Sequence, residues 1–292
     1  MCLVAFTFSP NPCWRFVLAA NRDEYLDRPT APLAWWPNTS IVGGRDLRAG
    51  GSWMAVSRGG RFAAVTNFRL GNAVVDPNAK SRGHLVLHVL NGVSVSSHND
   101  LTDNGVIDCT SDNTIAKHLA KVGPCNLLWG DLRSGAMHFN SNQSDDLSDN
   151  LTNSISNDPD SSLQNGLVYG LSNGKLDADW PKTSGLKISL AQAIQSHQGD
   201  ERGLTNSLFD ALAVDVQAPD AQLPATGVSL EFERVLSARF IATPTYGTRS
   251  STVILVDNQH GTTIIERTWD HAARALGKPA PYTERMVRFQ IT

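Results

Sequence analysis

The sequence predicts an α+β protein in which two mainly antiparallel sheets pack face to face and carry helices on their outer faces. Strand-like segments separated by tight turns fill the first 70 residues, helix-like spacing occupies the middle, and strand-like segments return near the end. This order differs from the strand–helix alternation of a parallel wound sheet. The 292 residues suffice for one large core, so residues 1–292 are expected to form a single domain.

Two hairpins are predicted at the start of the chain. Residues 2–8 (CLVAFTF) and 14–20 (WRFVLAA) are rich in β-branched and aromatic residues and flank the turn SPNPC. Residues 52–57 and 61–68 flank a second turn signal, Arg-Gly-Gly. Between the two hairpins, the polar stretch NRDEYLDRPTAP is expected to leave the sheet as a proline-marked loop.

Periodicity predicts the remaining elements. Helices are expected at residues 81–92, 114–122, 186–197 and 204–214, and strands at residues 126–132, 136–140, 166–173, 248–257 and 262–269. Residues 141–162 contain five Asp and no Lys or Arg, which predicts a flexible acidic loop over residues 141–165.

The composition excludes several classes of function. The formal charge is −3 and no basic block occurs, which disfavours nucleic-acid binding. No apolar run reaches 18 residues, so no membrane insertion is expected. The four cysteines form no CxxC pair, which favours free thiols and a cytoplasmic location. His84 and His88 share a helix face, but without an HExxH glutamate we expect a structural role and no metal site.

Cys2 is the first candidate functional residue. Removal of Met1 would leave Cys2 as the first residue, with a nucleophile and a base in the same amino acid. Its α-amine would titrate near ~7.7–8 and could accept the thiol proton. A neighbouring guanidinium would lower the thiol pKa from ~8.5 towards a reactive thiolate. The alternative is a buried cysteine without a chemical role.

The polar residues Asn21, Arg22, Asp23 and Glu24 are the second candidate. A hairpin turning at residues 9–13 pairs position 2 with roughly position 20, so these residues are expected near the thiol. An aspartate there can orient the α-ammonium, and an arginine can stabilise the thiolate or bind a substrate carboxylate. The alternative is a solvated turn.

Several motifs in combination resemble the NRDE family, the family of transport and Golgi organisation proteins. They are MCLVAFTF, ANRDEYLDRPT, GGRDLRAGGSW, AAVTNFR, SRG, NLLWGDL and YGTRSSTVILVD. The resemblance implies a four-layer αββα sandwich like that of the N-terminal-nucleophile (Ntn) hydrolases, with the residue after Met as the nucleophile.

The sequence is more distantly similar to the cysteine acylases of that fold, the penicillin V acylases and bile salt hydrolases. This similarity implies Cys2 as nucleophile, Asp23 as the strand-two aspartate, Asn67 and Asn173 as oxyanion donors, and Arg249 as the late arginine. One departure is Ala20, because the acylases carry arginine three residues before that aspartate. Arg22 is expected to point to the opposite face of its strand from Asp23.

These observations lead to one leading function and two alternatives. The leading expectation is a cysteine hydrolase acting on a C–N amide or acyl bond, with no cofactor required. Its small-molecule substrate is expected to contact Asn21, Arg22, Glu24, Trp53 and Arg69. The first alternative is a carrier that uses the same cleft to bind haem or another hydrophobic anion, such as an acyl-CoA-like lipid. The second is a scaffold without activity that binds protein partners.

Overall fold

The fold is taken from a computed structural model of the chain. The structure describes all residues except 1, 72–78, 92–111, 144–162 and 274–279. Met1, Cys109 and most of the acidic loop predicted at residues 141–165 therefore lie outside the described residues.

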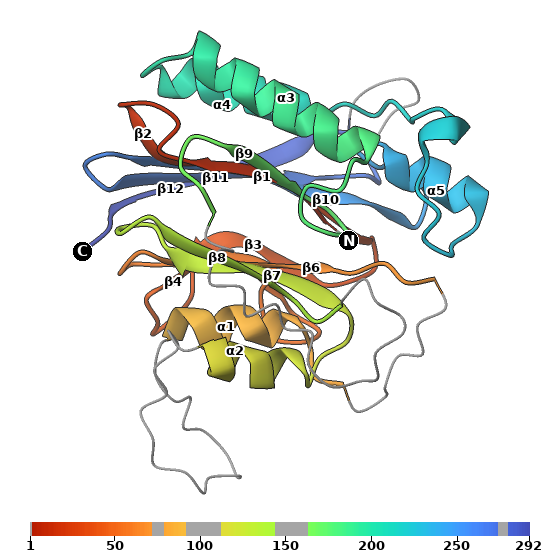
Figure 1. The fold of residues 1–292 in the computed structure, drawn as a ribbon, viewed down its shortest axis with the longest axis horizontal. Coiled ribbons are helices and arrows are strands. Elements are labelled where there is room, and N and C mark those ends of the chain that lie inside the picture. The colour runs from red at the N-terminus through yellow and green to blue at the C-terminus, as the bar shows by residue number, and fades with distance from the viewer. Residues whose placement is uncertain (1, 72–78, 92–111, 144–162, 274–279) are drawn as a thin grey trace, which may run out of the picture.

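Two six-stranded sheets form the centre of the molecule (Figure 1). In spatial order, the first sheet contains β12 (Tyr282–Gln290), β11 (Gly261–Trp269), β10 (Tyr246–Asp257), β2 (Trp14–Tyr25), β1 (Cys2–Phe8) and β9 (Val168–Leu171). The second contains β3 (Thr30–Trp35), β4 (Ile41–Asp46), β5 (Met54–Ser57), β6 (Arg61–Asn67), β7 (Cys125–Asp131) and β8 (Ala136–Ser141). Neighbouring strands are antiparallel in both sheets.

Helices cover the outer face of each sheet. The first sheet carries α3 (Pro181–Ser196) and α4 (Glu201–Leu212), and the second carries α1 (Gly83–Asn91) and α2 (Asp112–Leu119). A short 3₁₀ turn (Asp220–Gln222) and α5 (Leu230–Ser237) lead into β10. The four layers, helix–sheet–sheet–helix, confirm the predicted αββα sandwich (Figure 1).

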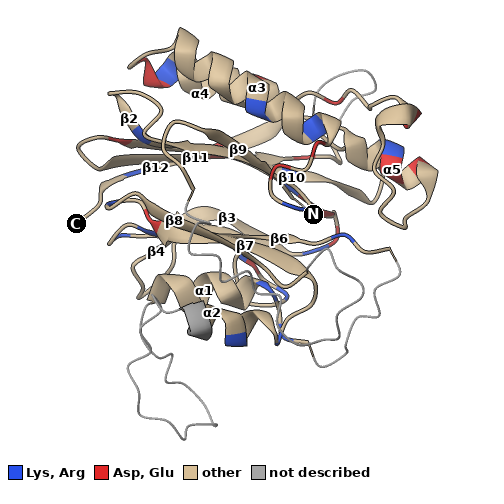
Figure 2. Ribbon diagram, viewed as in Figure 1, with Lys and Arg blue, Asp and Glu red and all other residues tan. Residues whose placement is uncertain are grey.

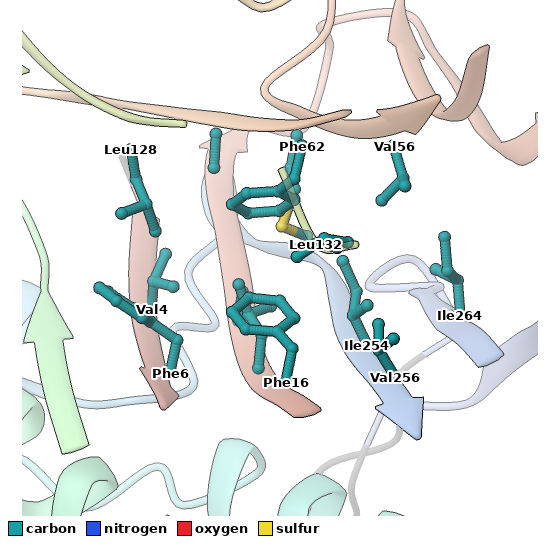
Figure 3. Close-up of a cluster of buried hydrophobic side chains, with 14 of the residues drawn as sticks. Val4, Phe6, Phe16, Val56, Phe62, Leu128, Leu132, Ile254, Val256 and Ile264 are labelled. Carbon is teal, nitrogen blue, oxygen red and sulfur yellow. The ribbon is translucent and has the colours of Figure 1, made fainter. Parts of the chain in front are cut away.

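The central strands are buried on both faces, which explains why their sequences read as continuous apolar runs. Along β1, Val4 and Phe6 face the second sheet, whereas Leu3 and Ala5 face α3 and α4. Figure 3 shows the layer between the sheets, where side chains such as Phe16 of β2 point towards those of the second sheet. Side chains at even positions of β1 and β2 therefore share the face between the sheets.

Several boundaries differ from the predictions. The stretch expected to leave the sheet at residue 21 instead continues β2 to Tyr25, because Asn21, Arg22 and Asp23 are buried and bonded within the sandwich. The sequence analysis also missed β3, β4, α5 and β12, and it placed the start of α3 too late. The start of β3 fell within the stretch that was predicted as a polar, proline-marked loop.

Candidate functional site

Cys2 begins β1 and lies between two strands. In the pairing with β2 it is opposite Arg22, two residues from the position that register counting predicted. On its other side, the Oγ of Ser172 donates a hydrogen bond to the carbonyl oxygen of Cys2 (3.0 Å), just beyond the end of β9. Cys2 is therefore held in the sheet on both sides, and its side chain is 8% exposed.

A cavity of about 560 Å³ opens at this end of the sandwich. Among the expected site residues, the cavity is lined by Cys2, Arg22, Asp23, Glu24, Trp53 and Asn67. The lining also includes the segment that leads into α1, with Lys80 and Arg82. Residues that are far apart in the sequence thus meet around Cys2.

Arg22 and Trp53 line the cavity together with Cys2. The Arg22 guanidinium lies 4.4 Å from the centre of the Trp53 ring, and its Nη1 donates to Thr30 Oγ1 (3.3 Å). The Trp53 ring occupies space that only glycine leaves open, because a Cβ on Gly44 would lie 2.1 Å from the ring. The arginine is therefore held between the sheets, on the face that Cys2 shares.

The thiol itself is protonated in this setting. Burial raises the pKa of the Cys2 thiol, and the nearby Arg22 charge opposes that shift without cancelling it. The Arg22 guanidinium lowers the thiol pKa, as expected, but the effect of burial is larger. A nucleophilic Cys2 requires a base that removes its proton.

Asp23 lies on the opposite face of β2, as the alternation of strand side chains predicts. Its carboxylate accepts a hydrogen bond from Thr248 Oγ1 (2.7 Å) and is 1% exposed. Burial raises the pKa of Asp23, whereas the positive charge of Lys182 lowers it. The Arg22 side chain thus lies on the face of β2 between the sheets and the Asp23 side chain on the helix face, and both residues belong to the cavity lining.

Lys182 is a buried residue that the sequence analysis missed. It follows Pro181 in the first turn of α3 and is 4% exposed. Burial lowers its pKa to about 8, and Asp23 opposes that change. The predicted helix began at residue 186, which left Lys182 in a loop, although proline at the first helical position is a known start signal.

The two expected oxyanion residues contact one another. Asn173 Nδ2 donates to the carbonyl oxygen of Asn67 (2.8 Å), and the amide of Arg69 donates to the carbonyl oxygen of Asn173 (2.7 Å). Asn67 lines the cavity, whereas Asn173 is fully buried behind it. The sequence analysis missed Asn126, which donates to the carbonyl oxygen of Gly174 (2.8 Å) and so joins the second sheet to this loop.

Besides Asn173, three expected site residues lie outside the cavity lining. Arg249 Nη1 donates to the carbonyl oxygens of Tyr25 at the end of β2 and of Leu26 and Arg28 in the β2–β3 connection (2.9–3.0 Å), and it lines a separate cavity. The Asn21 amide nitrogen donates to the carbonyl oxygens of Leu212 and Arg239 on the helix side. Arg69 forms a buried ion pair with Glu233 (2.7 Å). Arg249 was expected as a catalytic residue and Asn21 and Arg69 as ligand-binding residues; none of the three is among the residues that line the cavity.

The histidines lie elsewhere. The His88 ring stacks on that of His118 with 4.1 Å between the centres, and burial lowers the pKa of His88 to about 4. His84 and His88 are not among the residues that line the Cys2 cavity. Within the described ranges, no group of three or more His, Cys, Asp or Glu side chains is arranged to hold a metal ion. Nor does any described helix have the length and apolar character needed to cross a membrane.

The fold and site define an αββα sandwich with a cysteine at the head of a central strand, beside a charged cavity. The chain belongs to the family TANGO2, Transport and Golgi organisation 2, whose model matches residues 1–271. This finding confirms the family resemblance noted in the sequence.

Curated relatives match along most of their length. The chain is 30% identical over 282 residues to the Transport and Golgi organization protein 2 homolog of Bos taurus, covering 92% of this chain and 93% of the bovine protein. It is 26% identical over 286 residues to Transport and Golgi organization protein 2 of Drosophila melanogaster, covering 92% of each chain.

Two solved structures are also similar. One is a variant of conjugated bile acid hydrolase from Clostridium perfringens (TM-score 0.42, 11% identity, 100% of this chain and 98% of that chain). The other is an N-acylethanolamine-hydrolyzing acid amidase orthologue from Caenorhabditis elegans (TM-score 0.40, 11% identity, 87% and 92% of the two chains).

Proposed function

We propose that this protein is a cysteine hydrolase of the N-terminal-nucleophile type that acts on a C–N amide or related acyl bond. The observation that carries the proposal is the position of Cys2, held between two strands at the edge of a 560 Å³ cavity with Asp23 behind it. A frayed terminus could not hold a reacting atom in this way. A scaffold that only binds protein partners needs no such cavity.

The reaction begins with the base that the protonated thiol needs. After removal of Met1, the α-amine of Cys2 takes the thiol proton, and Asp23 orients the resulting ammonium. The Cys2 sulfur attacks the carbonyl carbon and forms a C–S bond. The C–N bond then breaks, and the ammonium returns its proton to the leaving nitrogen.

A second half-reaction restores the enzyme. Water gives one proton to the α-amine while its oxygen attacks the thioester carbon. The C–S bond breaks, the carboxylic acid leaves, and the sulfur regains its proton. Each half-reaction is therefore balanced within Cys2 and water, and no cofactor is needed.

Asn67 and Asn173 divide the task of stabilising the oxyanion. Asn67 lines the cavity and is the group that would meet the developing charge, whereas Asn173 fixes the Asn67 backbone through its 2.8 Å hydrogen bond. A preorganised donor of this kind contributes about 3–4 kcal/mol to the transition state in related chemistry. In this proposal Asn67 is a catalytic residue and Asn173 a positioning residue.

The charges around the cavity favour binding of an anionic substrate. They are equally compatible with the alternative function, a carrier of an anionic ligand. Its lining contains more cationic than anionic side chains: Arg22, Arg28, Arg48, Lys80 and Arg82 against Asp23, Glu24 and Asp46. A carrier of haem or an acyl-CoA-like lipid would use the same excess to bind its carboxylates or phosphates. In such a carrier the Cys2 sulfur would be the ligand that the cavity offers to iron.

Mass spectrometry with iodoacetamide tests the proposal. We expect the purified protein to begin at Cys2, and Cys2 to alkylate at neutral pH before the half-buried Cys13. A panel of N-acyl amides and thioesters should then yield a mass increase of one acyl group on Cys2, absent from Cys2→Ala and present in Cys13→Ala.

Two outcomes contradict the hydrolase. If the native protein retains Met1, Cys2 has no free α-amine to act as the base. If no compound of the panel acylates Cys2, Cys2 is not the nucleophile. A haem titration distinguishes the carrier from the hydrolase. The carrier is favoured if haem shows a Soret shift that is lost in Cys2→Ala and if no substrate acylates Cys2 in the unchanged protein.

A further inference from the structure

The strand β12 forms an open edge of the first sheet. It pairs only with β11 among the described strands, through all nine of its residues and without a register shift. Two other edge strands are protected. Asp177 covers β9 by accepting the Gly170 amide and donating its own amide to the Gly170 carbonyl oxygen, and β3 contains Pro32 and a register shift. Exposed edges usually carry such features because they otherwise pair with another strand. The edge of β12 has neither a proline nor a register shift, so its backbone is available for pairing.

Two hydrogen bonds at the ends of the β11–β12 pair show which backbone groups point outward. The amide of Asp270 donates to the carbonyl oxygen of Pro281 (2.8 Å), and the amide of Ile291 donates to the carbonyl oxygen of His260 (3.1 Å). Because the direction of the backbone groups alternates along a strand, the odd-numbered residues of β12 bond to β11. The even-numbered residues therefore present their N–H and C=O groups to the open edge; they are Tyr282, Glu284, Met286, Arg288 and Gln290.

The side chains of these five residues are exposed and share one face of β12. Met286 is opposite Ile265, which packs in the core beneath α3 and α4, so this face is the helix face of the sheet. Tyr282 and Met286 are large side chains that remain 45% and 47% exposed. The edge therefore offers apolar surface together with unpaired backbone groups.

Glu284 and Arg288 place opposite charges on either side of Met286. Glu284 accepts a hydrogen bond from Arg267 Nε (2.9 Å), and Arg288 Nη2 donates to Glu201 (2.6 Å). Both ion pairs are exposed, and a carboxylate or a guanidinium has room for a second partner. Each charge can therefore also meet an opposite charge across the edge.

The order of these residues is complementary to itself. When two copies of β12 pair antiparallel around Met286, Glu284 is opposite Arg288 of the second copy, and Tyr282 is opposite Gln290 of the second copy. In this register the outward-pointing residues of the two strands are opposite one another, which allows them to exchange both backbone hydrogen bonds. Opposite charges that face each other directly across two strands stabilise the pair.

Other symmetric registers are less favourable. Centring the pair on Glu284 opposes two glutamates, and centring it on Arg285 or Arg288 opposes two arginines. Centring it on Met286 directly opposes no like charges and is the register that uses all nine residues of β12. Charges on an edge usually prevent pairing, but here they favour a partner strand of the same sequence.

We propose that the protein forms a symmetric dimer in which the β12 strands of two copies pair antiparallel around Met286. The six-stranded first sheets of the two copies then form one continuous sheet. The lining of the Cys2 cavity contains no residue of β12, so the dimer leaves that cavity open to its ligand. The inference does not depend on the proposed hydrolase.

Sedimentation velocity over a range of protein concentrations tests the dimer. Glu284→Arg opposes like charges at both symmetric contacts, so the dissociation constant of the dimer should rise at least about tenfold. The double variant Glu284→Arg/Arg288→Glu exchanges the two charges and should restore the dimer. Glu231→Arg is the control, because Glu231 is exposed on α5, whose charged segments Figure 2 shows far from the C-terminal end of β12.

A disulfide tests the register. Residues that exchange both backbone hydrogen bonds have Cα atoms about 5.5 Å apart, within the range of a disulfide. Under mild oxidation, Met286→Cys should therefore form a covalent dimer, and peptide mapping should show the introduced cysteine linked to its own copy. Ile188→Cys, at an exposed position of α3, is the matched control and should stay monomeric.

Three outcomes overturn the inference. One is a protein that sediments as a monomer at every concentration up to about 100 μM. Another is a dimer whose dissociation constant is unchanged in a folded Glu284→Arg, because that dimer uses another surface. If Glu284→Arg does not fold, Met286→Lys is compared with Met286→Leu, and equal dissociation constants in that pair overturn the inference as well.

Discussion

Cys2 and Arg22 lie directly opposite one another in the antiparallel pair of β1 and β2. Side chains at opposed positions point to the same face of a sheet, so this register brings the guanidinium to the cavity side that the thiol occupies. Asp23, one residue further, is on the other face. In the proposed mechanism, a single step along β2 therefore separates the group that acts on the sulfur from the group that acts on the amine.

Replacing Arg22 by Gln should slow alkylation of Cys2. The Arg22 charge opposes the rise in the thiol pKa that burial causes, and its loss leaves less thiolate at neutral pH. We expect the rate of Cys2 alkylation by iodoacetamide to fall about tenfold. Mass spectrometry of the Cys2 peptide over time measures this rate. The control is Arg48→Gln, because Arg48 is exposed and lines the same cavity. Cys2 of this variant should be alkylated at the original rate.

Asn173→Ala should reduce acyl transfer to Cys2 more than it weakens substrate binding. Without the Nδ2 donor, the backbone of Asn67 loses its anchor and the oxyanion donor is no longer held in place. We expect kcat to fall by about 10²–10³ with little change in KM. A change confined to KM would mean that Asn173 acts on the bound substrate and not on the transition state.

Glu233→Gln should destabilise the protein strongly. The ion pair with Arg69 is buried, with side chains 6% and 4% exposed, and the substitution leaves the guanidinium without a counter-charge. The expected cost is about 3–5 kcal/mol in the free energy of unfolding, measured in urea. Asp220→Asn, which breaks the exposed pair with Arg234, should leave the urea midpoint unchanged.

Glu266 provides a test of the contact between the two sheets. Its carboxylate in β11 accepts the amide of Leu33 in β3 (2.7 Å), so Glu266→Ala leaves a buried donor unpaired and should cost about 1–3 kcal/mol. Glu266→Gln keeps the acceptor. At neutral pH, the thermal unfolding temperature of Glu266→Gln should therefore lie well above that of Glu266→Ala.

The same glutamate gives a pH dependence of known sign. Burial raises the pKa of Glu266 in the folded protein, so its contribution to stability is present below the unfolded pKa and is lost as the pH rises through the folded pKa. Relative to the unchanged protein, Glu266→Gln should gain stability between acidic and neutral pH. A constant difference across that range would show that the carboxyl does not titrate as described.

His88 should contribute to acid denaturation. Its pKa falls from 6.5 to about 4 on folding, so the unfolded chain binds a proton first as the pH falls from 6.5 towards about 4, and stability decreases. His88→Gln should lose less stability than the unchanged protein over this interval. Urea unfolding at several pH values measures the difference, and parallel curves would contradict it.

The sequence predicted the layers of this fold better than its polar strands. Apolar runs such as residues 2–8 identify central strands because both of their faces are buried. The end of β2 could not be predicted in this way. Asn21 and Asp23 are buried because they form hydrogen bonds with α4, β10 and the segment after α5, all of which are remote from β2 in the sequence.

The candidate site was predictable where it depended on local register and not where it depended on tertiary contacts. Counting residues around the first turn brought the NRDE residues to Cys2. Nothing local indicated that Arg249 would bind three carbonyl oxygens at the end of β2 and in the β2–β3 connection, or that Lys182 would be buried. Both outcomes depend on which segments pack together.

The connection between β9 and α3 carries Asn173 and leads directly to Lys182 in the first turn of α3, and Asp177 fixes its path. Its length is therefore constrained by two separate requirements at once, because an inserted or deleted residue would displace an amide and an ammonium together. The turn between β10 and β11 carries no residue of the candidate site, although its Asn258 Nδ2 donates to the carbonyl oxygen of Pro12. Over evolutionary time, changes in loop length should accumulate at turns of that kind and be eliminated from the β9–α3 connection.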